Sequence, residues 1–190
     1  MFEVRLHGRG GQGVVTAAEL LSVAAFDEGR HAQAFPSFGS ERTGAPVASF
    51  CRIDEREIRL REPIVDPDAL IIQDPTLFHS VDVFAGLKDG GYLLVNSTKT
   101  LAELGISDVA ERLPPGHALC LPATEIALRH IGRPLPNAAL LGGFAALTGR
   151  VGLAAVLKAI RARFAGRVGE ANAAAAEEAF TLMQKEVAPC

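Results

Sequence analysis

The sequence predicts an α/β fold with a mostly parallel, Rossmann-like sheet, helices on both of its faces, a β-hairpin insertion and a helical C-terminal cap. Two observations lead to this prediction. Up to residue 121, short apolar runs alternate with helical stretches, a pattern typical of βαβ units. From Pro134 onward the pattern is helical only. Because the chain has 190 residues and no long linker, we expect one domain, residues 1–190.

The first unit is a strand, a glycine-rich turn and a helix. Residues 2–6 alternate like a strand, and residues 14–26 place apolar side chains near the 3.6-residue period of a helix. Four glycines fall within the six positions 8–13 between them. Such a density of glycine permits positive φ angles and lets a phosphate or another backbone approach the main chain closely. We therefore expect a tight strand-to-helix turn.

The middle of the chain combines a loop, a hairpin and further strands. Residues 33–46 contain two prolines and two glycines and are expected to form a loop. Residues 47–53 and 57–60 alternate around a charged turn and predict a hairpin. Asp74 is suited to cap a helix that runs toward Phe84. Further strands are expected at 69–73, 92–96 and 117–121, with a short helix at 107–113.

The C-terminal third is expected to hold three helices. Asn137 is suited to cap the first of them, which ends near Thr148. The other two are expected at 151–165 and 169–186. Together they form the expected helical cap.

Composition and charge argue against several classes of protein. The 19 basic and 22 acidic residues give a net charge of −3 without a basic cluster, so nucleic acid and anionic membranes are poor candidate partners. The longest apolar run, residues 138–147, is interrupted by two glycines and is too short for a membrane span. The chain enters a strand at once and carries no secretory signal, so we expect a cytoplasmic protein.

The residue types that carry metal or covalent chemistry form no pattern. Cys51, Cys120 and Cys190 are widely spaced without a C-x-x-C, so we expect no disulfide, zinc site or iron–sulfur cluster held by this chain alone. No histidine pair has metal-ligand spacing, and neither G-x-S-x-G nor a Walker A motif occurs. We assign no catalytic residue and no metal ligand.

The glycine-rich turn satisfies the dinucleotide-binding pattern G-x-G-x-x-G through Gly8, Gly10 and Gly13. A nicotinamide enzyme also needs an acid at the tip of its second strand, about 20 residues further on, to hold the ribose hydroxyls. Residues 30–37 contain no carboxylate. Two interpretations stay open: a phosphate site, or a turn that only packs the strand against the helix or a partner protein.

A second loop, from Ser37 to Gly44, could share one edge of the sheet with this turn. Arg9 and Arg42 would then place cations near backbone donors at a helix start, which suits a phosphate or a carboxylate. Equally, Glu41 and Arg42 could pair with each other or with a neighbouring subunit. The candidate ligand-facing or active-site-facing residues are His7, Gly8, Arg9, Gly10, Gly11, Gln12, Gly13, Ser37, Gly39, Glu41, Arg42 and Gly44.

Two long motifs, in this order, resemble a known family. The sequence resembles the gamma subunit (gamma domain) of the 2-oxoacid:ferredoxin oxidoreductases, of which pyruvate:ferredoxin oxidoreductase is the best-known member. The likeness covers essentially the whole chain. The residues that carry it are 5–18, 33–36, 38–39 and 41–47, supported by 74–75, 95–97 and 136–143.

The resemblance implies a multisubunit enzyme that uses thiamine diphosphate and coenzyme A to decarboxylate a 2-oxoacid oxidatively, which yields an acyl-CoA and CO₂. It implies that electrons pass through [4Fe-4S] clusters on partner subunits to ferredoxin or another acceptor. Thiamine diphosphate, Mg²⁺ and the clusters would belong to alpha-, beta- and delta-type subunits, and none to this chain alone. The two loops would face the substrate or coenzyme A.

Two other functions are weighed against this one. The first is a self-sufficient NAD(P)-dependent dehydrogenase, and the second is a domain that senses a nucleotide or coenzyme A without being an enzyme. Which 2-oxoacid and which final electron acceptor the complex uses does not follow from the sequence.

Overall fold

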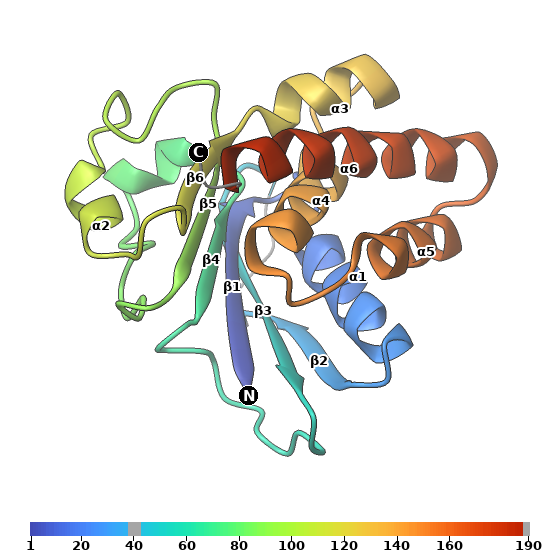
Figure 1. Ribbon diagram of the computed structural model, residues 1–190, viewed down its shortest axis with the longest axis horizontal. Coiled ribbons are helices and arrows are strands. Elements are labelled where there is room, and N and C mark those ends of the chain that lie inside the picture. The colour runs from blue at the N-terminus through green and yellow to red at the C-terminus, as the bar shows by residue number, and fades with distance from the viewer. Residues whose placement is uncertain (38–42, 188–190) are drawn as a thin grey trace.

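A six-stranded sheet forms the centre of the computed structural model, which describes residues 1–37 and 43–187 (Figure 1). Its strand order is β2-β3-β1-β4-β5-β6. The last four strands in this order are parallel neighbours, whereas β3 runs antiparallel to both β1 and β2. The strands are β1 (Phe2–Arg9), β2 (His31–Pro36), β3 (Pro46–Asp54), β4 (Ala69–Ile72), β5 (Tyr92–Asn96) and β6 (Ala118–Leu121).

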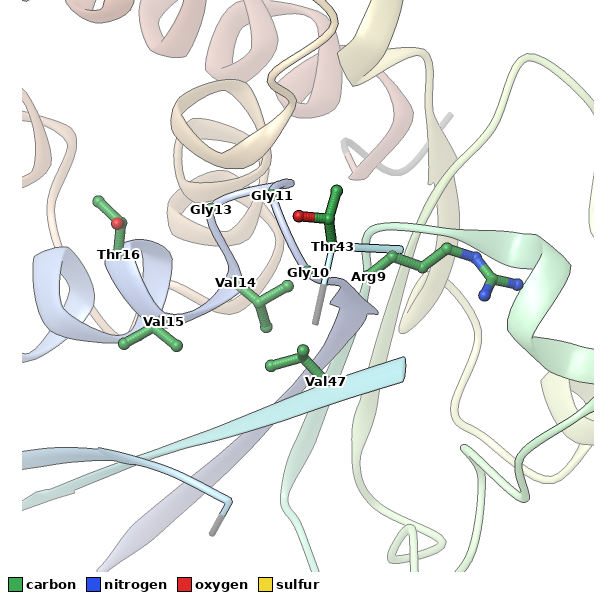
Figure 2. A pocket seen from close by; sticks show the side chains of 9 residues that line it. All are labelled: Arg9, Gly10, Gly11, Gly13, Val14, Val15, Thr16, Thr43 and Val47. Carbon is green, nitrogen blue, oxygen red and sulfur yellow. The ribbon is translucent and has the colours of Figure 1, made fainter. Parts of the chain in front are cut away.

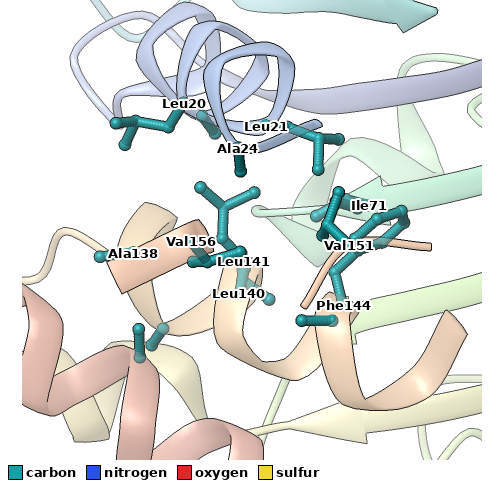
Figure 3. Packing of buried hydrophobic residues seen from close by; sticks show 14 of the residues in the cluster. Leu20, Leu21, Ala24, Ile71, Ala138, Leu140, Leu141, Phe144, Val151 and Val156 are labelled. Atoms are coloured by element: carbon teal, nitrogen blue, oxygen red, sulfur yellow. The ribbon is translucent and has the colours of Figure 1, made fainter. Parts of the chain in front are cut away.

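Five helices cover one face of the sheet (Figure 1). Ile71 of β4 packs in the same core as Leu21 of α1 (Val14–Asp27) and Phe144 of α4 (Asn137–Thr148) (Figure 3). Helix α4 lies between the sheet and α6 (Gly166–Val187), which explains why the sequence of α4 is apolar on nearly every side. The five are α1 (Val14–Asp27), α3 (Ala123–Ile131), α4 (Asn137–Thr148), α5 (Leu153–Arg163) and α6 (Gly166–Val187).

Shorter elements cover the other face. The 3₁₀ helix η1 (Pro75–His79) and the helix α2 (Ser107–Glu111) pack on a second core that includes Ile72 and Val95. The expected α/β class, mostly parallel sheet, helices on both faces and helical C-terminal part are confirmed. Most predicted elements agree with the structure to within a few residues at their ends.

The predicted hairpin is wrong. Residues 57–60 form no strand, and β3 pairs instead with β1 and β2, which both precede it in the sequence and run antiparallel to it. Its register joins Ala48 to His7 of β1 and Phe50 to Phe35 of β2. Alternation shows that a strand forms but not which strand it pairs with, and a place between β1 and β2 pairs both edges of β3.

Three further predictions differ from the structure. Residues 33–36 belong to the edge strand β2, where Phe35 packs on Phe50 with ring centroids 5.1 Å apart, so the expected loop is shorter. The helix expected after Asp74 is only the 3₁₀ helix η1, although Asp74 does cap it by accepting a hydrogen bond from Thr76 N. Asn137 does not cap α4, because it already lies in the first helical turn. Helix α3 has no counterpart among the expected elements.

At the carboxyl ends of β1 and β4, the chain turns to opposite faces of the sheet. The chain leaves β1 through α1 onto one face, and it leaves the neighbouring strand β4 through η1 onto the other face. Open α/β sheets bind ligands at such a switch point, outside the carboxyl ends of the strands. The glycine-rich turn lies at this edge, directly after β1.

Candidate ligand site at the glycine turn

The turn between β1 and α1 requires glycine at particular positions. Gly11 and Gly13 have φ angles of 95° and 76°, in the left-handed region where other residues are strained. A Cβ on Gly13 would also lie 2.6 Å from Nδ2 of Asn137 at the start of α4, and one on Gly8 would lie 2.6 Å from Cγ2 of Val14. The turn is therefore pressed between its own helix and α4.

The N-terminus of α1 offers backbone donors to a ligand. No side chain of the described residues caps it, and its first internal hydrogen bond runs from Ala17 N to Gly13 O at 2.9 Å. The N–H groups of residues 14–16 thus have no acceptor within the helix. A cavity of about 400 Å³ opens beside them (Figure 2), lined by Arg9, Gly10, Gly11, Gly13, Val14, Val15, Thr16, Thr43 and Val47. Free donors and the helix dipole favour an anion here.

The end of the second loop lies against this turn. Gly10 N donates to Ala45 O at 2.9 Å, and Gly44 N donates to Gly10 O at 3.0 Å. Ser37 is further away, where its N–H donates to Ala48 O of β3. Three of the candidates, Gly39, Glu41 and Arg42, lie outside the described residues.

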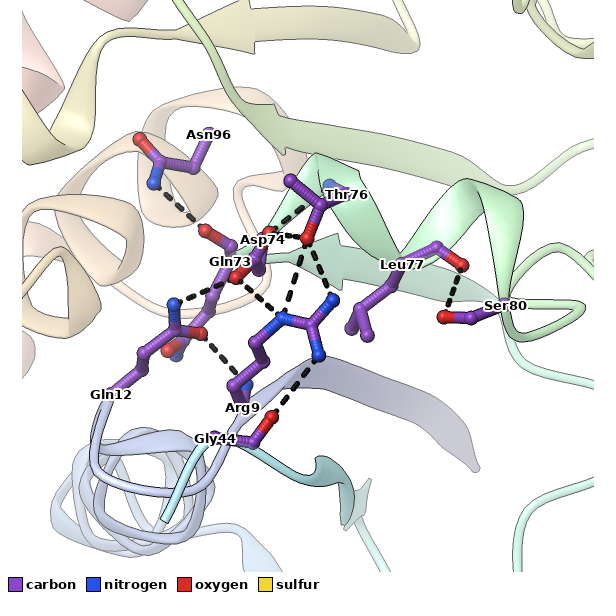
Figure 4. A network of polar contacts seen from close by, with 9 residues as sticks. All are labelled: Arg9, Gln12, Gly44, Gln73, Asp74, Thr76, Leu77, Ser80 and Asn96. Carbon is purple, nitrogen blue, oxygen red and sulfur yellow. Dashed lines mark hydrogen bonds and ion pairs between the residues drawn. The ribbon is translucent and has the colours of Figure 1, made fainter.

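Arg9 turns its guanidinium away from the cavity (Figure 2). Nε lies 3.1 Å from Oδ2 of Asp74, Nη2 donates to Oγ1 of Thr76 at 2.8 Å, and Nη1 donates to the carbonyl of Gly44 at 3.1 Å (Figure 4). Its charge is therefore partly compensated inside the protein. The positive potential at the cavity comes chiefly from the backbone N–H groups.

Gln12 closes the turn. Its Oε1 accepts a hydrogen bond from Arg9 N at 2.7 Å, and its Nε2 donates to Oδ2 of Asp74 at 2.9 Å (Figure 4). Gln12 also lines a second cavity, of about 610 Å³, at the carboxyl ends of β4, β5 and β6. The turn thus separates two cavities at the same edge of the sheet.

His7 is buried behind the turn and not at the cavity. Its Nε2 accepts a hydrogen bond from Arg5 Nε at 3.0 Å. Burial, together with the positive charge of Arg5, lowers the pKa of His7 to about 4. The imidazole is therefore neutral at neutral pH, and in this structure it serves to orient a buried arginine.

Comparison with known proteins supplies the family. A sequence profile described as "Pyruvate ferredoxin/flavodoxin oxidoreductase" matches residues 3–182. The chain belongs to this family. The resemblance to its gamma subunits is thereby confirmed, and the fold of the gamma subunit is the one described above.

Relatives and a solved structure support the same assignment along the whole chain. The pyruvate/ketoisovalerate oxidoreductases common subunit gamma of Thermococcus kodakarensis is 52% identical over 95% of this chain and 96% of its own. Pyruvate synthase subunit PorC of Methanocaldococcus jannaschii is 47% identical over 98% and 99%. The crystal structure of pyruvate oxidoreductase subunit PORC from Thermotoga maritima aligns with a TM-score of 0.78 at 36% identity, over 95% of each chain.

The gamma subunit lacks the geometry of a nicotinamide site. In the dinucleotide fold the acid at the tip of the second strand reaches the ribose because that strand lies beside the first. Here β3 lies between β1 and β2, and β2 itself carries no carboxylate. The self-sufficient dehydrogenase is accordingly not favoured.

Asp74 and Thr76 are the site residues that the sequence analysis missed. Asp74 was expected only as a helix cap, yet it also holds Arg9 and Gln12 from 65 and 62 residues away. A signal was present, because the carboxyl ends of parallel strands meet at one edge and Asp74 follows a buried strand there. Position in the sequence alone does not show that β4 lies next to β1.

The described residues contain no donor set for a metal or a cluster. No group of three or more His, Cys, Asp or Glu side chains comes together among residues 1–37 and 43–187. Burial raises the pKa of Cys51 to about 12 and that of Cys120 to about 11, so both remain thiols at neutral pH. In the same part of the chain, no helix has the length and apolar character needed to cross a membrane.

Proposed function

We propose that this gamma subunit works in a thiamine diphosphate-dependent complex that oxidatively decarboxylates pyruvate and transfers the acetyl group to coenzyme A. Electrons leave through [4Fe-4S] clusters of partner subunits to ferredoxin or another acceptor. The names of relatives that are 44–52% identical over nearly the whole chain support pyruvate as the substrate. Alpha-, beta- and delta-type subunits hold thiamine diphosphate, Mg²⁺ and the clusters, and the complex works in the cytoplasm.

Within this complex, the cavity at the start of α1 binds a phosphate group of coenzyme A. The observation that carries this assignment is the uncapped first turn of α1, whose N–H groups border a cavity of about 400 Å³ behind glycines with positive φ. Coenzyme A is strongly anionic, and a helix N-terminus with free donors suits its phosphates. The 2-oxoacid, by contrast, reacts on the thiamine cofactor of the partner subunits.

The names of the relatives favour coenzyme A over the 2-oxoacid as the ligand of this subunit. In Thermococcus and Pyrococcus the gamma subunit is named as common to pyruvate and ketoisovalerate oxidoreductases. A subunit shared by enzymes for two different 2-oxoacids suits a component that both reactions use. Coenzyme A is such a component in this family.

An added acid in the first turn of α1 tests the site. Thr16→Asp places a carboxylate at the cavity, where it interacts favourably with the helix dipole but repels a phosphate. We expect the KM for coenzyme A of the assembled complex to rise about tenfold, which corresponds to roughly 1.4 kcal/mol. The melting temperature of the complex should stay the same or rise.

Val23→Asp is the matched control. It adds the same charge to an exposed position of the same helix, roughly 10 Å further along. This variant should leave the KM for coenzyme A within twofold of the wild type. An unchanged KM in Thr16→Asp would contradict the assignment of the cavity to coenzyme A.

A further inference from the structure

Two aspartates, Asp68 and Asp74, flank the strand β4 and differ in their hydrogen-bond and ion-pair partners. Asp68, at the amino end, accepts a hydrogen bond from Glu3 N at 2.8 Å and pairs with Nζ of Lys88 at 2.8 Å. Asp74, at the carboxyl end, accepts four hydrogen bonds. Both carboxylates are mostly shielded from solvent. Only Asp74 lies beside the glycine turn.

The four donors divide evenly between the two oxygens of Asp74. Oδ1 accepts from Thr76 N at 3.0 Å and from Thr76 Oγ1 at 2.6 Å, which fixes the carboxylate at the start of η1. Oδ2 accepts from Arg9 Nε at 3.1 Å and from Gln12 Nε2 at 2.9 Å (Figure 4). Asp74 therefore connects the start of η1 to both ends of the glycine turn.

We infer that Asp74 is a positioning residue that holds the glycine turn in its ligand-binding conformation. The inference rests on the proposed function, because the ligand is the coenzyme A phosphate assigned to the first turn of α1. Asp74 does not line that cavity, although it lines the second cavity together with Gln12. It acts through Gln12, which closes the turn, and through Arg9, which ties the turn to Gly44.

The charge of Asp74 is part of this role. Burial acts to raise its pKa, but the hydrogen bonds from Thr76 and Gln12 and the positive charge of Arg9 outweigh burial and leave the pKa below its ordinary value. The group is thus ionised throughout the physiological range. A neutral amide in its place accepts more weakly and turns an N–H group toward donors that already point at it.

Asp74 anchors the turn through side chains, beside the backbone hydrogen bonds of Gly10 with Gly44 and Ala45 and the close approach of Gly13 to Asn137. Glycine gives residues 10, 11 and 13 wide conformational freedom, so without Asp74 the turn that borders the cavity samples more conformations. A preformed site binds more tightly than one that has to be ordered by its ligand. Asp74 therefore contributes to the affinity for coenzyme A through the conformation of the turn.

The test is Asp74→Asn in the assembled complex, with Asp68→Asn, at the other end of β4, as the matched control. We expect the KM for coenzyme A to rise about tenfold in Asp74→Asn, because hydrogen bonds to a charged group are among the stronger ones in proteins. The kcat and the KM for pyruvate should stay within twofold. Asp68→Asn should leave all three constants within twofold of the wild type.

Hydrogen exchange of the complex provides a readout apart from activity. The amide of Gln12, which donates to Arg9 O at 3.0 Å, should exchange at least several-fold faster in Asp74→Asn and at the wild-type rate in Asp68→Asn. Unchanged exchange would overturn the positioning role. So would a KM for coenzyme A that does not change in Asp74→Asn while Thr16→Asp raises it, and that result would leave the proposed function intact.

A different result identifies failure of the proposed function. If exchange at Gln12 accelerates in Asp74→Asn but neither variant changes the KM for coenzyme A, Asp74 positions the turn and coenzyme A does not bind there. An equal loss of activity and thermal stability in both Asp→Asn variants would show a general structural role of the carboxylates and would overturn the inference.

Discussion

Burial controls the protonation of His7, and this gives folding stability a pH dependence of known sign. The folded-state pKa is lowered to about 4 from an ordinary value of 6.5. As the pH falls from about 6.5 to 4, the unfolded chain takes up a proton at His7 that the folded chain excludes. The free energy of unfolding therefore decreases over that window and is unaffected by this group at higher pH.

We expect His7 to cost about 2 kcal/mol of stability between pH 7 and pH 5, from the lowered pKa and the linkage relation. His7→Gln keeps an acceptor for Arg5 Nε but cannot be protonated. Urea unfolding of both proteins at the two pH values measures the difference. Equal pH dependence of the wild type and His7→Gln would contradict the lowered pKa of His7.

At the scale of residues, the sequence allows part of the site to be predicted. Glycine reports backbone conformation directly, and Gly11 and Gly13 do adopt the left-handed angles that the dense glycine turn predicts. The partner of a charged side chain is another matter. Arg9 pairs with Asp74, and neither residue carries a local signal for a contact across 65 positions. Such pairs depend on which strands are neighbours.

At the scale of elements, the crossing of α4 and α6 gives a sharp test of packing. A Cβ on Gly142 would lie 2.0 Å from the carbonyl oxygen of Ala176 in α6, which is backbone and cannot move independently. A Cβ on Gly143 would instead meet Cδ2 of Leu121 at 2.6 Å, the end of a flexible side chain. A side chain at position 143 can therefore be accommodated by a shift of Leu121, whereas one at position 142 requires the two helices to move.

We expect Gly142→Ala to lower the free energy of unfolding by about 2 kcal/mol or more, because the two helices must move apart. Gly143→Ala should cost less than about 1 kcal/mol, since Leu121 can shift and alanine is the better helix former. Chemical unfolding of the two variants and the wild type compares them. Equal losses would show that the close approach to Ala176 does not limit this position.

Elements with a strong local pattern could be predicted, and those defined by pairing could not. Helix α1 and the strand β5 match their expected ranges closely. Burial of one face of α1 leaves a helical period in the sequence, and burial of both faces of β5 leaves a short continuous apolar run. Residues 33–36 of the edge strand β2 fall within the expected loop, because the two prolines and two glycines of residues 33–46 signal turns more strongly than a short apolar run signals a strand. The partners of β3 are set by the sheet as a whole.

At the scale of the whole molecule, the order of the strands separates β1 from β2 and so removes one part of a dinucleotide site. Inserting β3 between β1 and β2 keeps the glycine turn and the start of α1 but removes the neighbouring strand tip that would hold a ribose. What remains is the uncapped start of α1, which we propose binds a phosphate of coenzyme A, without a nucleoside-binding acid on β2. This arrangement explains why G-x-G-x-x-G alone is misleading in this chain.

The last prediction concerns the division of labour in the complex. If the gamma subunit binds coenzyme A and the partner subunits bind the 2-oxoacid, Thr16→Asp should raise the KM for coenzyme A by the same factor with pyruvate and with 2-oxobutyrate. The ratio of kcat/KM for these two 2-oxoacids should stay within about twofold of the wild type, because the substitution leaves the contacts that distinguish them untouched. Steady-state rates of the assembled complex with a viologen acceptor give both quantities. A ratio that shifts more than the KM for coenzyme A would mean that the first turn of α1 borders the 2-oxoacid, since only contact with the reacting acid discriminates between chains that differ by one methylene group.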